Sequence, residues 1–245
     1  MAVYSKKQLT EQAELIGVVK ALTALTIFRL IQTSKRLHET EDMLKKINAS
    51  LTRVFELYPF GEEQSIRAQA RIKEIEAKTP PRVLYVLVSS NKELYGDLIL
   101  RIAKSFIEDI KKTNYDGLVI GKVGKNLIEK EALANKITFF DIDDDKPEYH
   151  VFQEMMKFVS GYTKVVVYHG KSESLLHQFA AKSEVNRELP NIIKPARKYF
   201  FEPTPEEVLE FLKQQVEINS FHQKMFEAQM ARLTAKKWNW TKQQL

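Results

Sequence analysis

The sequence predicts an α/β protein in which a long N-terminal helix and a long C-terminal helix form an antiparallel coiled coil beside a central α/β domain. Three observations support this prediction. The first stretch of about 50 residues contains one Gly and no Pro. Short apolar runs then alternate with helical patterns through the middle of the chain. A second stretch without Gly or Pro follows a clear helix start near the C-terminus.

Composition limits the class of protein. A chain of 245 residues with 44% hydrophobic residues can bury a large core, and without cysteine it has no disulfide or thiolate metal site. The net charge of +6 is spread along the chain, so no nucleic-acid surface is predicted. The apolar run Ala21 to Phe28 is far shorter than the roughly 20 residues of a membrane span, and acidic residues precede it, unlike in a signal peptide. We therefore expect a folded soluble protein without direct membrane insertion.

Residues 1–58 are predicted to form one N-terminal coiled-coil helix, from about Lys7 to Tyr58. Its apolar residues recur at helical spacing and then every seven positions: Leu15, Val18, Val19, Leu22 and Leu25, then Leu30, Leu37, Leu44 and Leu51, with Ile47 and Val54 between them. Such a helix is about 75 Å long at 1.5 Å per residue. Because a domain of this size cannot cover it along its whole length, the helix is predicted to project and to need a partner.

Residues 59–81, with Pro59, Gly61 and a Pro pair at the end, are predicted to be a linker containing at most a short helix from Gln64 to Ala77. Residues 82–199 then alternate between the two kinds of pattern. The predicted strands are "RVLYVLVSS", "DGLVIG", "KITFFDI" and "TKVVVYHG", and the predicted helices are Glu93 to Lys112 and Pro147 to Ser160. Apolar strands separated by helices indicate a mostly parallel sheet covered on its faces, hence a Rossmann-like domain.

The stretch "VLVSSNKELYGDL" follows the first strand, where α/β proteins often bind phosphate groups at a helix N-terminus. Ser90 and Glu93 have the S-x-x-E spacing of a capping box. The sequence therefore predicts that a helix beginning here caps itself, with the Glu93 carboxylate in the place that a phosphate would need.

Other motifs are incomplete. The stretch "GKVGKN" lacks the glycine spacing and the hydroxyl of a phosphate-binding loop. In "DIDDDKPEYHVF", Asp occupies the first, third and fifth positions of a calcium loop, but the turn glycine and the final glutamate are missing. The five histidines show no metal-ligand spacing. No catalytic, cofactor-binding or metal-binding residue is predicted.

Residues 200–245 are predicted to form the C-terminal coiled-coil helix. Thr204 has the N-cap position, Pro205 the first helical position and Glu207 the capping-box position, and the helix is expected to reach about Lys237. Its expected seam repeats every seven positions, with further apolar residues beside it: Phe211, Ile218 and Met225, then Val208, Leu212, Phe226 and Leu233. Two helices with seams at opposite ends of the chain are expected to pair antiparallel.

This arrangement and four motifs resemble the gamma subunit of F-type ATP synthases. The family pattern V-S-(S/T)-D-(K/R)-G-L-C-G-G-L-N is similar to Val88 to Ile99, and Y-x-x-E-P-x-P-x-x-x-L-x-x-L is similar to the segment from Tyr199 to Leu212. The family's A-R-M-x-A resembles residues 231–235, and its S-K pair in the first helix resembles Ser34-Lys35. The C-terminal helix ends earlier than in the family, so a divergent and C-terminally short member is expected.

The resemblance implies a non-catalytic central-stalk subunit whose coiled coil turns inside a ring of alpha and beta catalytic subunits. It also implies that the α/β domain, the foot, contacts an epsilon-like subunit and, in a membrane complex, the ring of c subunits. The expected location is therefore cytoplasmic and peripheral at the inner face of the membrane. No cofactor or nucleic acid is expected. The candidate contact residues are Lys20, Arg29, Ser34, Lys35, Arg36, Leu94, Tyr95, Gly96 and Arg232.

Two alternatives remain at the level of the sequence. One is a small α/β enzyme that binds a phosphorylated metabolite and uses its terminal helices to oligomerise. The lack of a complete catalytic motif disfavours it. The other is a coiled-coil adaptor that does not rotate, for which the early end of the C-terminal helix leaves room.

Overall fold

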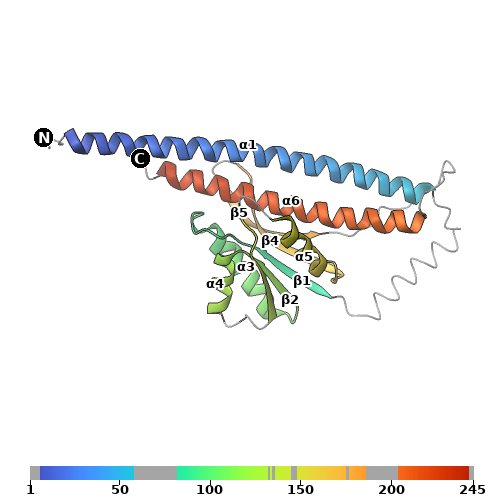
Figure 1. The fold of residues 1–245 in the computed structure, drawn as a ribbon. Coiled ribbons are helices and arrows are strands. Elements are labelled where there is room, and N and C mark those ends of the chain that lie inside the picture. Colours follow the sequence, from blue (N-terminus) through green and yellow to red (C-terminus); the bar gives the residue numbers. More distant parts are fainter. Residues whose placement is uncertain are drawn as a thin grey trace.

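Two long helices and a five-stranded α/β domain make up the computed structural model (Figure 1). The structure describes residues 6–57, 82–131, 133, 136–144, 148–174, 177–185 and 204–242. Helix α1 (Lys6–Leu57) and helix α6 (Pro205–Lys242) lie side by side and antiparallel, with the α/β domain on the α6 side. The predicted fold class is therefore confirmed. The expected linker at 59–81, with its short helix, lies outside the described residues.

The sheet has the strand order β3-β2-β1-β4-β5. Its strands are β1 (Val83–Val88), β2 (Asp116–Ile120), β3 (Ile137–Phe140), β4 (Lys164–Ser172) and β5 (Gln178–Val185). The first four are parallel, whereas β5 pairs antiparallel with β4. The predicted, mostly parallel sheet is confirmed, but β5 is not among the predicted strands because its sequence, "QFAAKSEV", carries little apolar signal.

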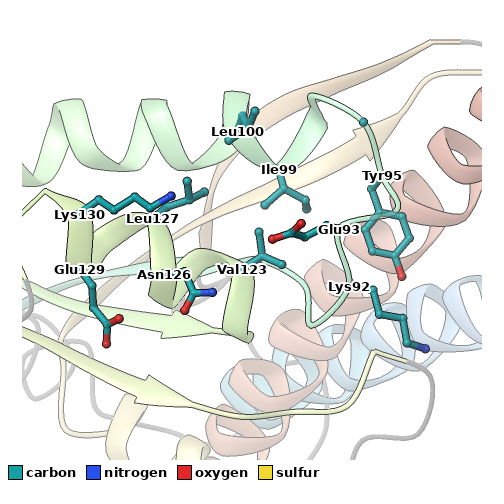
Figure 2. Close-up of a pocket in the computed structure, with 11 residues that line it drawn as sticks. Lys92, Glu93, Tyr95, Ile99, Leu100, Val123, Asn126, Leu127, Glu129 and Lys130 are labelled. Atoms are coloured by element: carbon teal, nitrogen blue, oxygen red, sulfur yellow. The ribbon is translucent and has the colours of Figure 1, made fainter.

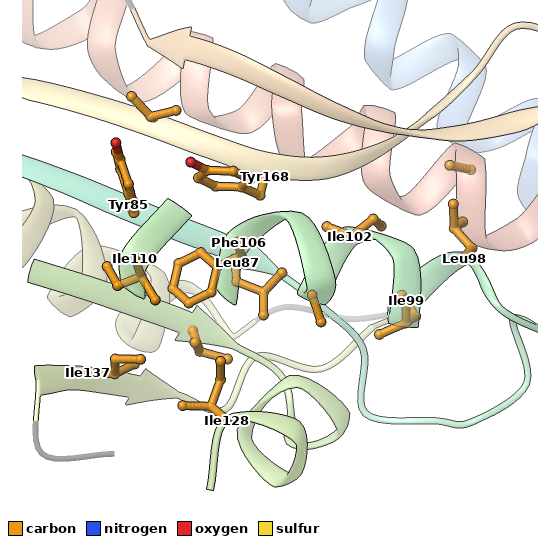
Figure 3. Packing of buried hydrophobic residues seen from close by; sticks show 14 of the residues in the cluster. Tyr85, Leu87, Leu98, Ile99, Ile102, Phe106, Ile110, Ile128, Ile137 and Tyr168 are labelled. Atoms are coloured by element: carbon orange, nitrogen blue, oxygen red, sulfur yellow. The ribbon is translucent and has the colours of Figure 1, made fainter. Parts of the chain in front are cut away.

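Helices cover both faces of the sheet. Helices α3 (Leu98–Lys112) and α4 (Lys122–Lys130) pack on one face, and α5 (Tyr149–Val159) packs on the other. Figure 3 shows the first core, where Phe106 of α3 and Tyr168 of β4 meet edge to face with ring centroids 5.5 Å apart. The buried Tyr168 hydroxyl donates to Asp109 at 2.7 Å. Burial and this acceptor raise the pKa of Tyr168 well above its ordinary value.

Helix α6 packs between α1 and the sheet. Ala231 and Ala235 join the core under α3, whereas Phe221 and Ala228 join the core under α5. Thr204 caps the helix as predicted, since its hydroxyl accepts from the Glu207 amide at 3.3 Å. Because α6 contacts both cores as well as α1, apolar residues occur on several of its sides.

The predicted coiled-coil seam of α6 is therefore wrong, because the residues expected to face α1 do not face it. Ile218 and Met225 pack against the core under α5, and Phe211 is exposed. The residues that meet α1 are Leu209, Leu212 and Val216, which pack with Ile47 and Leu51. A sequence pattern cannot assign each apolar side of a helix to one of two surfaces, because both surfaces impose helical spacing.

The seam of α1 is confirmed at Leu30, Ile47, Leu51 and Val54, which are buried. This buried stripe also contains Thr33, just after Leu30, and Thr26, one turn before Leu30, each 3% exposed. The Thr26 hydroxyl donates to the Leu22 carbonyl at 2.9 Å, so this buried polar group is satisfied within its own helix. The buried seam thus extends further toward the N-terminus than the leucine repeat indicates.

The N-terminal end of α1 projects beyond the C-terminal end of α6 (Figure 1). At 1.5 Å per residue, the 52 residues of α1 span about 78 Å and the 38 residues of α6 about 57 Å. The apolar residues of the N-terminal part of α1, Leu15, Val18, Leu22 and Leu25, are 41–67% exposed. The sequence predicts a projecting helix with its seam in the second half, and the exposure of these residues agrees with that prediction. In the described part of the chain, no helix is both long and apolar enough to cross a membrane.

Candidate partner-binding surfaces and the α6–sheet junction

The loop between β1 and α3 differs from the sequence prediction. The helix begins at Leu98 rather than at Glu93, and the Ser90 hydroxyl donates to the Lys92 carbonyl at 2.9 Å. Gly96 has φ of 61°. Because a residue with positive φ cannot lie in a right-handed helix, Gly96 delays the start of α3. The predicted capping box is therefore wrong.

The amides of this region bind other groups of the same domain. The Asn91 amide donates to the buried Asp144 carboxylate at 3.0 Å. At the start of α4, the Lys122 amide donates to Asn91 Oδ1 at 2.8 Å and the Val123 amide donates to the Ser90 carbonyl at 2.9 Å. These are the amides that a phosphate-binding loop would offer to its ligand. Here they fasten the loop to α4 and to the segment after β3.

Close packing accounts for the two glycines of "GKVGKN". A Cβ at Gly121, where φ is 98°, would lie 2.8 Å from the Ser90 backbone. A Cβ at Gly124 would lie 2.6 Å from the Ser89 Cβ. These glycines let the first turn of α4 approach the loop after β1, which is a packing role and not a phosphate-binding one.

A groove of about 750 Å³ lies between the loop, the start of α3 and α4 (Figure 2). Apolar side chains line its centre, where the Glu93 carboxylate also lies, and other charged side chains line its ends: Tyr95, Ile99, Leu100, Val123 and Leu127 at the centre, then Lys92, Glu129 and Lys130. The candidates Tyr95 and Gly96 line it, with Tyr95 buried and Gly96 exposed. Leu94, in the same loop, is 46% exposed. Apolar side chains in an open groove are typical of a protein-binding surface.

We call the contact of three α6 residues with the sheet the α6–sheet junction: Glu227, Ala231 and Arg232 meet Ser89, His169 and Gly170. Arg232 is its central polar residue. Its side chain is buried, donates to the Ser89 carbonyl and lies 3.8 Å from the Asp144 carboxylate. Gln229, one turn earlier, donates to the Asp144 carbonyl at 3.1 Å. The prediction that Arg232 contacts a partner subunit is therefore corrected. Its interaction partners are in this chain, and it connects α6 to the loop after β1.

The junction fills the crevice where doubly wound sheets bind ligands. In such sheets the crevice lies at the carboxyl ends of two neighbouring strands, at the point where the chain leaves one strand toward one edge of the sheet and the other strand toward the opposite edge. Here these strands are β1 and β4. Ala231 of α6 packs against Gly170 of β4, and Arg232 binds Ser89 after β1. A phosphorylated metabolite would have to displace α6 to bind there, which argues against the enzyme alternative.

Replacing Gly170 by alanine is expected to weaken this junction. The added Cβ would lie 2.9 Å from the Ala231 Cβ, which is closer than real Cβ contacts, and 3.3 Å from the Leu98 side chain, which is a tight contact. We expect the free energy of unfolding of the full chain to fall by about 1–3 kcal/mol in urea denaturation. The matched control is Gly17→Ala in α1, which meets nothing within 4 Å and should be neutral or stabilising by up to about 1 kcal/mol. Equal stability of the two variants would contradict the packing argument.

The candidate residues on α1 lie in its N-terminal half, which ends near Ile31, or just beyond it, beside the buried Thr26, Leu30 and Thr33. Lys20, Ser34, Lys35 and Arg36 are exposed, whereas Arg29 is half-buried. Lys35 lies 3.8 Å from Glu39 on the same helix, and both side chains are exposed, so this pair contributes little to stability. These residues are therefore accessible to a partner, with Arg29 only partly so.

Large apolar side chains are exposed on the same half of α1: Leu15, Ile16, Val18, Leu22, Leu25, Ile27, Phe28 and Ile31. They do not form a single stripe. At about 100° per residue, Ile16 and Leu25 point to opposite sides of the helix. A helix that is apolar on all sides is normally buried in protein. The sequence predicts several of these residues as apolar positions of a helix that is too long for the domain to cover and is expected to need a partner.

A projecting helical shaft fastened to an α/β foot, with apolar side chains around its free end, defines a protein that inserts its shaft into a larger assembly. The sequence matches the family model described as ATP synthase over residues 5–238, and the chain belongs to this family, the F-type ATP synthase gamma family. No curated protein sequence matches the chain.

Two solved structures show the same fold at 13% identity. One is the central stalk and c-ring of the Tetrahymena thermophila mitochondrial ATP synthase, where the match covers 93% of this chain and 100% of that chain with a TM-score of 0.57. The other is the rotor of the Euglena gracilis mitochondrial ATP synthase, where the match covers 97% of this chain and 88% of that chain with a TM-score of 0.60.

Proposed function

We propose that this chain is the central-stalk subunit of a rotary F-type ATP synthase or ATPase, and that its helices turn inside a ring of alpha and beta catalytic subunits. The observation that carries the proposal is the N-terminal half of α1, whose first turns project beyond α6 and whose exposed apolar side chains face several directions. A ring with a central hole surrounds a helix on all sides, as such a surface requires. Membership of the family and the likeness to two central-stalk structures support the same function.

The mechanism that we propose is mechanical. An antiparallel pair of unlike helices has no rotational symmetry, so it presents different side chains to each surrounding subunit. Its angle therefore favours a different conformation in each catalytic subunit. The basic residues Lys20, Lys35 and Arg36, with Arg29 and Ser34 beside them, would face acidic segments of the ring and fix register rather than supply large affinity. The chemistry of ATP would take place in the partners.

Torque requires that the foot and the shaft turn as one body. Phe221, Ala228 and Ala231 of α6 are almost fully buried in the two cores of the α/β domain. Arg232 adds polar contacts from the same helix to the loop after β1. These contacts make α6 part of the foot as well as part of the shaft, which supports transmission of rotation between them.

The foot would contact the other stalk components. We propose that the groove beside Leu94, Tyr95 and Gly96 binds an epsilon-like subunit, because its apolar centre and mixed charges suit a protein surface. A ring of c subunits is a further possible partner. The chain would then be peripheral to the membrane, held there through its complex.

Reconstitution tests the proposal directly. The full chain is mixed with purified alpha and beta subunits, and assembly is followed by size-exclusion chromatography. We expect a complex that hydrolyses ATP and turns a bead attached to the foot. Failure to assemble would contradict the proposed function. Assembly without ATP-driven rotation would instead favour the non-rotating adaptor, and phosphorylated-metabolite turnover by the free chain would favour the enzyme.

A further inference from the structure

The histidines of the chain divide into two groups. His38, His150 and His177 are exposed and lie near carboxylates. The other two lie where α6 meets the α/β domain. His169 of β4 is fully buried at the α6–sheet junction, and the ring of His222 on α6 stacks on Phe152 of α5 with centroids 4.2 Å apart. His169, which is buried, and His222, which is half-buried, therefore both lie between the shaft helix and the foot.

The surroundings of His169 provide a partner for both nitrogens of the neutral ring. Its Nε2 lies 2.9 Å from the Ser183 hydroxyl, which can donate to or accept from the ring, and its Nδ1 lies 3.1 Å from the Gly170 carbonyl. Nδ1 is also 3.7 Å from Glu227 Oε2. That carboxylate oxygen is buried and has no hydrogen-bond partner in the described part of the chain. When His169 is neutral, the junction therefore contains a buried carboxylate oxygen of Glu227 beside the imidazole ring.

Charged groups face these histidines from several elements. Glu227 and Lys224 on α6 form a pair at 3.0 Å beside His169, and Lys171 lies next along β4. Glu41 of α1 lines the cavity that borders this pair. Around His222, the neighbouring groove is lined by Glu210 and Glu217 of α6 and Lys157 of α5. Burial nevertheless outweighs the attraction of Glu227 and lowers the pKa of His169, and burial likewise lowers the pKa of His222.

We propose that protonation weakens the contact of α6 with the α/β domain. The contact is closed when His169 and His222 are neutral and opens more readily when they take up protons. A histidine whose pKa is lowered in the closed contact binds a proton more readily after the contact opens into water. The closed state is therefore most favoured above about pH 6.5, the ordinary histidine pKa, and loses stability as the pH falls below it. The opening constant rises by up to about tenfold per pH unit for each histidine.

Hydrogen exchange of the full chain tests the proposal. Between about pH 7.5 and pH 5.5, after correction for intrinsic exchange, we expect protection of amides at 165–170 and 221–232 to fall about 10- to 100-fold. Amides of β2 and α3 should change much less. In the variant His169→Gln, His222→Gln this pH dependence should disappear. The matched control, His150→Gln with His177→Gln, changes two exposed histidines and should keep it.

Two outcomes of this experiment would overturn the proposal. One is a pH dependence that persists unchanged in the variant lacking His169 and His222. The other is an equal loss of protection throughout the sheet, because acid would then unfold the domain as a whole. The test uses the free chain, so it does not depend on the proposed function.

A second measurement on the unsubstituted chain covers the case in which the double variant does not fold. ¹⁵N–¹H spectra of the histidine rings report the protonation state and the tautomer of each ring. At about pH 6.5, the ordinary histidine pKa, we expect His169 to be neutral, with its proton on Nδ1. An imidazolium ring at that pH would overturn the proposal, because the closed contact would then favour the proton.

Discussion

Replacing Arg232 by methionine is expected to lower the free energy of unfolding of the full chain by about 3–5 kcal/mol. The guanidinium is buried, donates to the Ser89 carbonyl and lies 3.8 Å from the buried Asp144 carboxylate. Methionine preserves much of the volume but removes both interactions. A buried carboxylate without its cation and a buried carbonyl without its donor would remain. Urea denaturation followed by circular dichroism measures the loss.

The matched control is Arg36→Met, which removes the same side chain from an exposed position of α1 and should change stability by no more than about 0.5 kcal/mol. Adding Asp144→Asn to the Arg232 variant separates charge from packing. If the unpaired carboxylate causes the loss, the double variant should be less destabilised than the two single changes predict together. A loss at Arg232 no larger than that at Arg36 would show that the guanidinium does not fasten α6 to the foot.

Local patterns predicted most of the secondary structure. Helix α1 was expected from Lys7 to Tyr58 and extends from Lys6 to Leu57. The four parallel strands were expected because each is a continuous apolar run. Helix α4 and strand β5 were not expected. The nine residues of α4 include Gly124 and follow Gly121, and these two glycines disfavour a helix but are required by the close approach to Ser89 and Ser90.

The loop after β1 could not be predicted, because its conformation depends on distant residues. The Asn91 amide donates to Asp144, which is 53 positions further along the chain. Arg232 reaches Ser89 across 143 positions. Ser90 and Glu93 have capping-box spacing, but the backbone turn at Gly96 prevents a helix from starting there. No local signal in the sequence reveals contacts of this range.

The candidate surfaces were predicted in part. The sequence identified the apolar residues of the N-terminal part of α1 and the loop around Leu94, and the structure leaves these residues exposed, with Tyr95 as a buried exception. The helical spacing of the α1 residues indicates an apolar surface, and the length of the helix predicts that it projects. Which of these residues another part of the same chain covers depends on the relative placement of α1 and α6, which no local pattern gives.

Introducing two glutamates on opposite sides of the projecting part of α1 is expected to abolish assembly while leaving the free chain intact. The variant Ile16→Glu, Leu25→Glu changes side chains that are 51% and 46% exposed, so the free energy of unfolding should change by no more than about 0.5 kcal/mol at each site. Burial of each side chain in a partner would contribute about 1.5–3 kcal/mol. Losing both weakens binding by about 10²- to 10⁴-fold, since each 1.4 kcal/mol corresponds to about tenfold.

The control introduces the same two charges where the shaft is already paired. Asn48→Glu with Ala49→Glu lies on exposed positions of α1 beside the buried Ile47 and Leu51, and should leave both stability and assembly nearly unchanged. Binding of each variant to a purified ring of alpha and beta subunits is measured by titration with a fluorescently labelled chain. If the variant at Ile16 and Leu25 binds as tightly as the control, the ring does not enclose this part of α1. The apolar side chains on opposite sides of the helix would then require a different partner.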